Sequence, residues 1–438
     1  MVEIKSFRGV HYNPGKFDDF SKLIAPPYDV ISAEMQDELY KSSEYNIVRI
    51  IKGKDSGEDT DTANKYTRAG EFFNDWLEKN ILVRDEQESI YIYYQEFTAA
   101  GQKYERTGFI ALVKLEGYGK GVLPHEFTLK GPKADRLNLM RASKTHTGQV
   151  FCLYPDPEKK IDDVLDEEKS NAEPMIDVTD DEGIKHRLWA VTNASSIDKI
   201  ISVMAEKQLF IADGHHRYET ANTYMEENPT LEGAKYGMMT FVNMQNVGLV
   251  VLPTHRLVKN LEEFEPAQFE DKLQGDFILE TFEFSAKNEE DQRKAMFTKL
   301  RQLYDSGKHA FGMYCENDRY YLVTLKDDSS LGTRTDIPGV LKQLDVTILH
   351  SLILDSILGI DEEKLAQQAN VEYIKDTGTA IQESIDMVNS GEFQLVFFMN
   401  PPKVEEIDLV AGAGEKMPQK STFFYPKVYS GLIINKIE

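Results

Sequence analysis

Residues 207–221, KQLFIADGHHRYETA, combine a short apolar run, a glycine and the start of a helical pattern. The run 207–212 is apolar enough for a central strand, and apolar side chains recur at helical spacing through 217–227. Gly214 lies between them, where it permits a tight turn and a close approach of a ligand to the backbone. The stretch predicts a buried strand that enters a helix through a sharp turn.

The predicted turn places anion-binding groups at a helix N-terminus. Unpaired backbone N–H groups and the partial positive charge of a helix N-terminus favour an anion. Arg217 adds a forked, permanently charged donor and His216 a further donor, while Asp213 can position a metal, a hydroxyl or the loop. These features predict a nucleotide-phosphate site. The alternative interpretation is an ordinary Asp-Gly turn in which Asp213 caps the helix and His215 and His216 are packed polar residues.

Length and composition describe an acidic globular chain. Its 438 residues exceed the usual size of a single core, so two or three packed units are expected. The hydrophobic fraction of 41% and the charged fraction of 28% are those of ordinary globular proteins. A formal net charge of −24 argues against a broad DNA-binding surface, which needs a basic face, although a local basic pocket is compatible with it.

Two further features concern the compartment. No apolar run reaches the roughly 18 residues that span a bilayer, and the N-terminus has no apolar secretory stretch. Cys152 and Cys315 are too few for a disulfide framework or a cysteine zinc site. We therefore expect a cytoplasmic protein that does not bind membranes.

The remaining pattern predicts an α+β protein with mixed sheets. The expected N-terminal elements are a helix capped by Ser32, a short buried strand at 46–51, a helix at 62–79, and a hairpin of strands 89–97 and 104–115. The acidic segment 156–183 is expected to form a surface helix and loop between units. The expected C-terminal elements are a hairpin at 310–325, helices at 345–359 and 379–389, and a strand at 394–399.

A second candidate site is the segment 123–128, LPHEFT, which brings a base, an acid and a hydroxyl together after a strand. Near phosphates, Glu126 could orient a metal or accept a substrate proton. Leu129 stands where a His-Glu-x-x-His zinc site needs its second histidine, so this is not such a site. The alternative is a capped turn with a structural His125.

Basic residues follow directly. Residues 130–144 contain five basic residues and a single acid, Asp135. The basic residues are Lys130, Lys133, Arg136, Arg141 and Lys144. This local reversal of charge predicts a mobile loop or helix that closes over an anionic ligand, with Arg136 among the phosphate-binding residues. The alternative is a solvated helix face paired with acids elsewhere.

Three more groups are candidates. Lys420, within MPQKST (417–422), could reach over the phosphates from the C-terminal part, although a strand-entry turn explains the segment equally well. His255 and Arg256 could contact substrate or phosphate, or be structural. Asp29, in APPYDV (25–30), follows two prolines that hold an extended segment. The sequence contains no Walker A loop, dinucleotide fingerprint or protein-kinase signature set.

The turn resembles the nucleotide-binding signature of the ParB/sulfiredoxin superfamily, in which a strand enters a Gly-x-His-Arg-type turn. The free-serine kinases of that fold have an Asp-Gly-x-His-Arg version, which Asp213, Gly214, His216 and Arg217 match. His215 replaces the reactive sulfiredoxin cysteine, so sulfinate reduction is disfavoured. The wider pattern is similar to the bacterial family DUF1015, which is related to those kinases. The pieces that match it are APPYDV (25–30), PHE-x-T (124–128), the turn, PTHR (253–256) and MPQKST (417–422).

The resemblance implies a ParB/sulfiredoxin-like core at 1–260 and a C-terminal α+β unit at 261–438 that packs over the site. It implies phosphoryl transfer from ATP or ADP, with Mg²⁺, to a small hydroxyl substrate, with L-serine as the first candidate. Gly214, His215, His216, Arg217, Arg136 and Lys420 would bind the nucleotide, and Asp213 and His216 would act in catalysis. The related kinases use an early acid as the base, and the sequence does not choose between Asp29 and Glu126.

Two other functions remain open. A nucleotide-binding sensor, as ParB-type modules can be, would bind nucleotide and transfer nothing, and it would have no need of a substrate base. A metal-dependent hydrolase would use His125, Glu126, His215 and His216, although their spacing matches no recognised ligand set.

Overall fold

The computed structural model describes residues 2–126, 131–327 and 329–438. The chain forms two compact units. The first contains 1–124, 128–250 and 426–438, and the second contains 125–127 and 251–425. The boundary therefore lies at 250/251, ten residues before the expected one, and the last thirteen residues return to the first unit. The packing of the C-terminal part over the turn stays a prediction.

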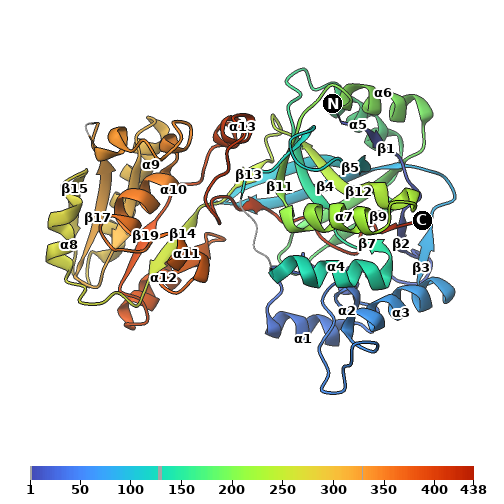
Figure 1. The fold of residues 1–438 in the computed structure, drawn as a ribbon, viewed down its shortest axis with the longest axis horizontal. Coiled ribbons are helices and arrows are strands. Elements are labelled where there is room, and N and C mark those ends of the chain that lie inside the picture. Colours follow the sequence, from blue (N-terminus) through green and yellow to red (C-terminus); the bar gives the residue numbers. More distant parts are fainter. Residues whose placement is uncertain (1, 127–130, 328) are drawn as a thin grey trace. The chain divides into compact units, whose positions relative to one another are not determined.

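The first unit is a mixed sheet with helices (Figure 1). Its strands are β1 (Ile4–Lys5), β2 (Val10–Tyr12), β3 (Leu82–Arg84), β4 (Ile90–Ala99), β5 (Gln102–Lys114), β6 (Val122–Leu123), β7 (Thr145–His146), β8 (Val150–Tyr154), β9 (Ile176–Thr179), β10 (Lys185–Val191), β11 (Leu209–Asp213), β12 (Tyr236–Asn243) and β21 (Asn435–Lys436). Its helices are α1 (Ala33–Ser42), α2 (Val48–Ile51), α3 (Lys65–Glu78), α4 (Gly131–Ser143), α5 (Lys160–Asn171), α6 (Ala194–Met204) and α7 (His215–Glu227). Strand β13 (Val250–Val251) lies at the boundary between the units.

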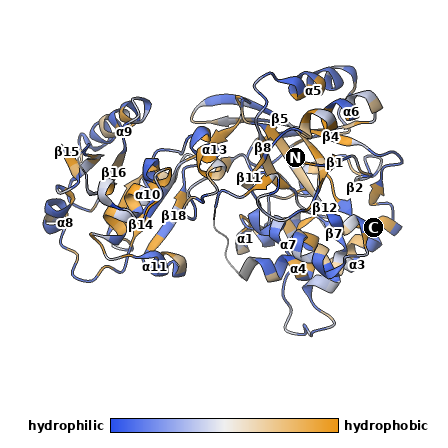
Figure 2. Cartoon of the chain, turned by 45° about the horizontal axis from the view of Figure 1, so that its top comes forward, coloured by the Kyte–Doolittle hydropathy of each residue, from blue (hydrophilic) through white to orange (hydrophobic). Residues whose placement is uncertain are grey.

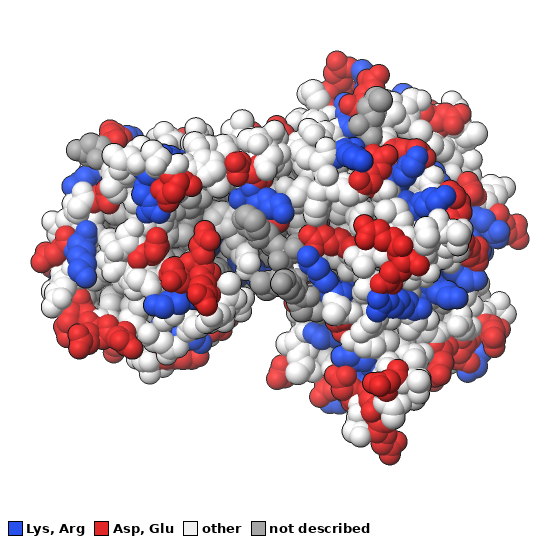
Figure 3. Space-filling model, viewed as in Figure 1, with Lys and Arg blue, Asp and Glu red and all other residues white. Residues whose placement is uncertain are grey.

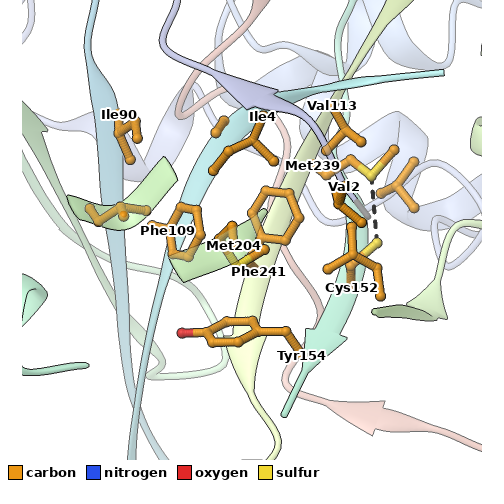
Figure 4. Close-up of a cluster of buried hydrophobic side chains, with 14 of the residues drawn as sticks. Val2, Ile4, Ile90, Phe109, Val113, Cys152, Tyr154, Met204, Met239 and Phe241 are labelled. Carbon is orange, nitrogen blue, oxygen red and sulfur yellow. Dashed lines mark hydrogen bonds between the residues drawn. The ribbon is translucent and has the colours of Figure 1, made fainter. Parts of the chain in front are cut away.

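The large sheet has the order β6-β11-β8-β12-β5-β4-β10-β9, with β1 added at β5. Strand β12 is parallel to β8, and β11 is parallel to β6, while the other pairs are antiparallel. Figure 4 shows one buried face of this sheet, where Phe109, Tyr154 and Phe241 pack together. Side chains from α5, α6 and α7 belong to the same apolar cluster, which fixes α7 against the sheet.

The second unit is an antiparallel sheet covered by helices. Its strands are β14 (Thr254–Val258), β15 (Phe277–Glu283), β16 (Ala310–Tyr314), β17 (Arg319–Leu325), β18 (Val371–Lys375), β19 (Leu395–Phe398) and β20 (Phe424–Tyr425). Its helices are α8 (Pro266–Leu273), α9 (Glu289–Asp305), α10 (Asp345–Ile348), a π-helix (Leu349–Asp355), α11 (Glu362–Gln367), α12 (Ala380–Asn389) and α13 (Val404–Gly412).

The sheet of the second unit has the order β15-β17-β16-β19-β14-β18. Strand β19 shows why both faces are covered, because its side chains alternate between two apolar clusters. Val396 and Phe398 pack in the cluster that includes residues of α9 and α12. Phe397 points into the cluster that includes residues of α8, α10 and the π-helix. Figure 2 shows hydrophobic residues along the strands and a mixture of hydrophobic and polar residues on the helices, as expected for helices that cover a sheet with one face.

Most of the expected elements are confirmed. These include the helix capped by Ser32, whose side chain accepts from Met35 N–H at 3.1 Å, and the hairpins β4–β5 and β16–β17. The expected strand at 46–51 is wrong, since 48–51 is the short helix α2. The side chain of Asn46 accepts from Val48 N–H at 2.9 Å, and Val48, Ile50 and Ile51 are buried. A six-residue segment with four apolar residues is too short for periodicity to distinguish a buried strand from a buried helical turn.

Segment 156–183 is also corrected. It contains α5 and β9, and β9 pairs with β10 at the edge of the large sheet, so the segment belongs to the first unit and is not a connection between units. Within the described part of the chain, no helix has the length and apolarity needed to cross a bilayer. Figure 3 shows acidic and basic side chains interspersed on the visible face.

Candidate functional site

The predicted strand–turn–helix is present. Strand β11 ends at Asp213, Gly214 has φ +90°, and α7 begins at His215. Gly214 is the N-cap residue, and a glycine has no side chain with which to cap the helix. Asp213 accepts only from the Gly214 N–H in this turn, at 2.9 Å, so the interpretation of Asp213 as the N-cap is wrong. The backbone N–H groups and the positive end of the dipole at the start of α7 are features that favour an anion.

Arg217 folds back over the turn. Its guanidinium donates to the carbonyl of Gln149 and lies 3.7 Å from a carboxylate oxygen of Asp213. Its side chain also lies against Gly148, where a Cβ would be 3.6 Å from Nη1 of Arg217. The guanidinium is thus held between the 148–149 backbone and the first turn of α7.

Asp213 forms a second ion pair with a residue that the sequence analysis did not select. Nζ of Lys427 lies 3.0 Å from Oδ2 of Asp213. Burial raises the pKa of Asp213, but the charges of Lys427 and Arg217 outweigh burial and hold that pKa well below its usual range. Lys427 is 214 residues from Asp213, and no pattern in the sequence connects two positions so far apart.

A narrow cavity adjoins Arg217 in the first unit. It is lined by apolar side chains, among them Leu139 and Met239, and by Tyr28, Arg136 and Thr220. Its volume is about 50 Å³, well below the several hundred cubic ångströms of typical ligand pockets. The Oγ1 atom of Thr220 is buried and has no hydrogen-bond partner among the described residues. A cavity of about 50 Å³ is too small to enclose a nucleotide, so a nucleotide would have to lie mainly outside it.

The structure brings Asp29, Arg136 and Arg217 together around Tyr28. The guanidinium of Arg136 lies 3.9 Å from the centre of the Tyr28 ring. Burial is the main reason that the pKa of Tyr28 rises to about 12, and the charges of Asp29, Arg217 and Arg136 also act on it. Asp29 is exposed in the turn after Tyr28. An acid and two guanidinium groups thus share one small region of the first unit.

His215 and His216 begin α7. His215 is buried, with 8% of its surface exposed, and its charge contributes to lowering the pKa of Asp213 after burial and the two cations. His216 is half-buried. Among the described residues, no three His, Cys, Asp or Glu side chains form a group that could hold a metal ion. The metal-hydrolase alternative therefore has no ligand set in ranges 2–126, 131–327 and 329–438.

The basic segment forms α4, which packs beside α7 (Figure 1). Lys133 pairs with Glu219 of α7, and Arg141 pairs with Glu227 of the same helix. Arg136 is held by Asp135 and by the carbonyl of Ile51 at 2.7 Å. These contacts fit the interpretation of a helix face paired with acids. Only Arg136 lines the cavity, Lys144 is exposed, and Lys130 lies outside the described residues.

Glu126 belongs to the second unit. Its Oε1 accepts from the N–H of Thr422 at 3.0 Å and from the hydroxyl of Thr422 at 2.9 Å. His125 is buried, and its Nε2 lies 2.8 Å from the same hydroxyl. These contacts join 125–126 to the segment 417–422. Thr128 of the same motif lies outside the described residues.

Lys420 and PTHR (253–256) also belong to the second unit. Lys420 is exposed, has φ +58°, and accepts through its carbonyl from Arg256 at 3.1 Å. The Nδ1 atom of His255 accepts from Met399 N–H at 3.2 Å, and the ring is buried on β14. A contribution of Lys420 or Glu126 to the turn at 213–217 stays a prediction.

Comparison with known proteins places these features in a family. A family model described as "Protein of unknown function (DUF1015)" matches residues 4–347. No curated protein matches the sequence.

Solved structures show distant similarity only. A free serine kinase variant in complex with AMP is 13% identical, with 72% of this chain and 87% of that chain covered at a TM-score of 0.35. A conserved hypothetical protein from Pyrococcus furiosus is 15% identical, with 73% and 92% covered at a TM-score of 0.34. The C-terminally truncated SbnI from Staphylococcus aureus is 9% identical, with 73% and 85% covered at a TM-score of 0.33.

Proposed function

The chain belongs to the DUF1015 family, and from the geometry of its first unit we propose that it is a nucleotide-dependent phosphotransferase. The hydroxyl oxygen of a small substrate attacks the terminal phosphorus of ATP or ADP, the bond to the bridging oxygen breaks, and ADP or AMP leaves. The hydroxyl proton passes to a carboxylate. Free L-serine is the first acceptor to test. One observation carries the proposal: Arg217 lies over the glycine turn at the N-terminus of α7, in the same region of the first unit as Arg136 and Asp29.

The first unit supplies the groups that this reaction needs. Phosphoryl transfer requires positioning and charge neutralisation more than covalent chemistry. The N-terminus of α7, His216 and Arg217 would hold the phosphates, and Arg136 would face them across Tyr28. Since the cavity measures only about 50 Å³, the nucleotide would lie mainly at its mouth.

Asp29 is the proposed base. It is exposed and acts electrostatically on Tyr28 together with Arg217 and Arg136, so it lies near the region where phosphates would bind. Glu126 is the alternative base, but its Oε1 already accepts two hydrogen bonds from Thr422. A carboxylate that holds a loop in this way is less available to take a proton than an exposed one.

Magnesium would enter with the nucleotide. Mg²⁺ usually binds through phosphate oxygens, waters and one or two carboxylates, and would neutralise charge on the phosphates. Asp213 fits this role poorly because Lys427 and Arg217 already neutralise it. The metal would therefore bind mainly to phosphate oxygens and waters, which leaves the carboxylate of Asp29 for the proton.

A sensor that binds nucleotide without transfer is the second candidate. The observation in its favour is the small cavity, which leaves little enclosed space for an acceptor beside the phosphates. The observation against it is the exposed acid Asp29 beside two guanidinium groups, which nucleotide binding alone does not require.

A phosphotransfer assay separates these candidates. The purified chain is incubated with Mg²⁺ and labelled ATP or ADP, with L-serine and other small alcohols as acceptors. Phosphorylated acceptor that disappears in Arg217→Ala supports the phosphotransferase. Nucleotide binding without any phosphorylated acceptor supports the sensor, and the absence of both binding and transfer refutes the proposed site.

A further inference from the structure

A second cavity of the first unit lies among its helices, and we call it the helical cavity. It measures about 410 Å³ and is lined by residues of α1, of the segment that follows α2, and of α3 and α4. These helices pack one against the next along the same side of the unit (Figure 1). The volume falls within the range of small-molecule pockets. The helical cavity therefore offers the space for an acceptor that the narrow cavity beside Arg217 lacks.

The two cavities of the first unit share a wall. Four residues, among them Tyr28 and Arg136, line both of them, whereas Arg217 lines only the narrow one. Asp29, the proposed base, follows Tyr28 in the chain and acts electrostatically both on Tyr28 and on Lys52 of the helical cavity. A ligand in the helical cavity would thus lie close to the base, across the shared wall from the proposed phosphate site.

The acids in the lining of the helical cavity are already paired. Among the described residues, three carboxylates line it, and each lies within ion-pair distance of a cation that lines it too. The pairs are Asp37 with Lys54, Asp55 with Lys65, and Asp135 with Arg136. Because the charge of each acid is compensated, the lining offers little attraction to an incoming ammonium group.

Lys52 is the remaining cation of the lining. Its Nζ donates to the carbonyl of Tyr28 at 3.1 Å and to the carbonyl of Ile31. No carboxylate of the described residues forms an ion pair with it, and one of its three N–H groups remains for a ligand. Burial and the neighbouring charge of Arg136 lower the pKa of Lys52. An anion beside Lys52 would stabilise its charged form.

We propose that the helical cavity binds the carboxylate of a small hydroxy acid, and that this acid is the phosphoryl acceptor. The carboxylate lies against the ammonium group of Lys52, and the hydroxyl extends past Tyr28 toward Asp29. The hydroxyl oxygen bonds to the terminal phosphorus of the nucleotide, the bond to the bridging oxygen breaks, and the hydroxyl proton passes to Asp29. The role as acceptor rests on the proposed function, whereas the binding of a carboxylate does not.

The charges of the lining also predict which part of the acceptor is recognised. Four cations and three acids line the helical cavity, so one positive charge is left for a monoanion. A phosphate dianion would exceed that charge beside three acids. An ammonium group finds only acids that already have partners. A carboxylate is therefore required for binding, and an amino group is not.

Isothermal titration calorimetry of the full chain without nucleotide tests the site. The probes are L-serine and L-glycerate, which has a hydroxyl in place of the amino group. Ethanolamine and glycerol are the matched compounds without a carboxylate. The two acids are expected to bind within about threefold of each other, and both other compounds more weakly by about tenfold or more.

Three results of this titration would overturn the proposal. The first is ethanolamine or glycerol binding as tightly as L-glycerate. The second is the absence of binding of either acid at up to about 10 mM. The third is a preference for L-serine over L-glycerate larger than about threefold, which would show that the ammonium group is recognised.

Variants locate the binding. Lys52→Gln removes the charge, keeps an N–H donor for the carbonyls, and is expected to weaken L-glycerate binding by about tenfold or more. Ala33→Trp places a ring in the helical cavity from an exposed position of α1, at little risk to the fold, and is expected to weaken binding as well. Lys41→Gln changes an exposed lysine of α1 outside the lining and is the matched control. Unchanged binding in either of the first two variants, shown to be folded by thermal unfolding, refutes the site.

Titration of ADP separates this inference from the proposed function. ADP binding without L-glycerate binding would refute the helical cavity and leave the nucleotide site standing. L-glycerate binding that is lost in Lys52→Gln, without ADP binding, would refute the nucleotide site and leave the carboxylate site standing. If both bind, labelled ATP is expected to yield phosphoglycerate with a KM raised about tenfold or more in Lys52→Gln. Binding of both without transfer would overturn the role of the acid as acceptor.

Discussion

The side chain of Arg217 lies directly over Gly214, so that a Cβ placed on Gly214 would be 3.0 Å from Nε of Arg217. Gly214 also has φ +90°, a conformation that side chains with a Cβ rarely adopt. The glycine is therefore required twice, for the turn between β11 and α7 and for the position of the guanidinium. The conformation of the turn and the proposed phosphate site depend on the same residue.

Replacing Gly214 tests this dependence. Gly214→Ala is expected to lower the free energy of unfolding by about 1–2 kcal/mol through backbone strain, and to weaken ADP binding because the methyl group displaces Arg217. Urea denaturation and calorimetry measure the two effects. Gly101→Ala is the matched control, since Gly101 has φ +75° in the β4–β5 turn and nothing lies within 4 Å of its would-be Cβ. Normal ADP binding in Gly214→Ala would contradict the role of Arg217.

The ion pair of Asp213 with Lys427 predicts a stability effect. Asp213→Asn leaves Lys427, whose side chain is only 13% exposed, without this partner, and is expected to cost about 3 kcal/mol of unfolding free energy at pH 7. The pKa of Asp213 is lowered in the folded state, so its contribution is present above the unfolded pKa of about 3.9 and is lost as the pH falls below it. The loss caused by the variant should therefore shrink in acid. Asp177→Asn, in an exposed pair with Arg187, should have little effect at either pH.

The assignment of Asp29 as the base predicts that variants of Asp29 and of Glu126 differ in kcat. If phosphotransfer is observed, Asp29→Asn is expected to lower kcat by about 100-fold or more, with little change in nucleotide affinity. Glu126→Gln retains the hydrogen-bond acceptor for Thr422 and should leave kcat within about threefold of the natural chain. Asp18→Asn replaces an exposed acid of the same unit and controls for a change in net charge. The opposite pattern, with Glu126→Gln inactive and Asp29→Asn active, would assign the base to Glu126.

A buried histidine predicts acid sensitivity. Burial lowers the pKa of His146 to about 4, and its Nδ1 lies 3.0 Å from Nδ2 of Asn435. In the unfolded chain this histidine has a pKa near 6.5, so between about pH 6.5 and pH 4 the unfolded chain binds more protons than the folded chain does. The free energy of unfolding is therefore unaffected above about pH 6.5 and decreases as the pH is lowered from about 6.5 to 4. His146 alone accounts for a loss of up to about 3 kcal/mol of unfolding free energy over this pH range. His146→Gln should flatten the decline measured by urea denaturation at stepped pH, and His309→Gln, a partly exposed control, should not. An equally steep decline in His146→Gln would show that the ring does not remain neutral.

Local chemistry explains which features the sequence could predict. The strand, turn and helix around Gly214 follow from an apolar run, a glycine and helical spacing, and they are present at nearly the expected residues. The helix at 345–359 was expected as well, but 349–355 forms a π-helix, which periodicity does not distinguish from an α-helix. The segment 46–51 suggested a strand because its β-branched residues favour strands, whereas the side chain of Asn46 starts a helical turn.

Long-range contacts explain what the sequence could not predict. Lys427 reaches Asp213 because 426–438 returns to the first unit, where β21 pairs with β7. The carbonyl of Gln149 holds Arg217 from 68 residues away. No local pattern marks these partners, since each contact is created by the sheet.

The most direct test of the central claim is calorimetric titration of ADP and of Mg²⁺–ATP into the natural chain and into Arg217→Ala. Arg187→Ala, which removes a guanidinium from the β9–β10 edge of the same unit, serves as the matched control. Removing a charged donor to phosphate is expected to weaken binding by about 10- to 100-fold in Arg217→Ala, while Arg187→Ala binds as the natural chain does. Equal nucleotide affinity in the natural chain and in a folded Arg217→Ala would contradict the assignment of the turn at 213–217 as the phosphate site.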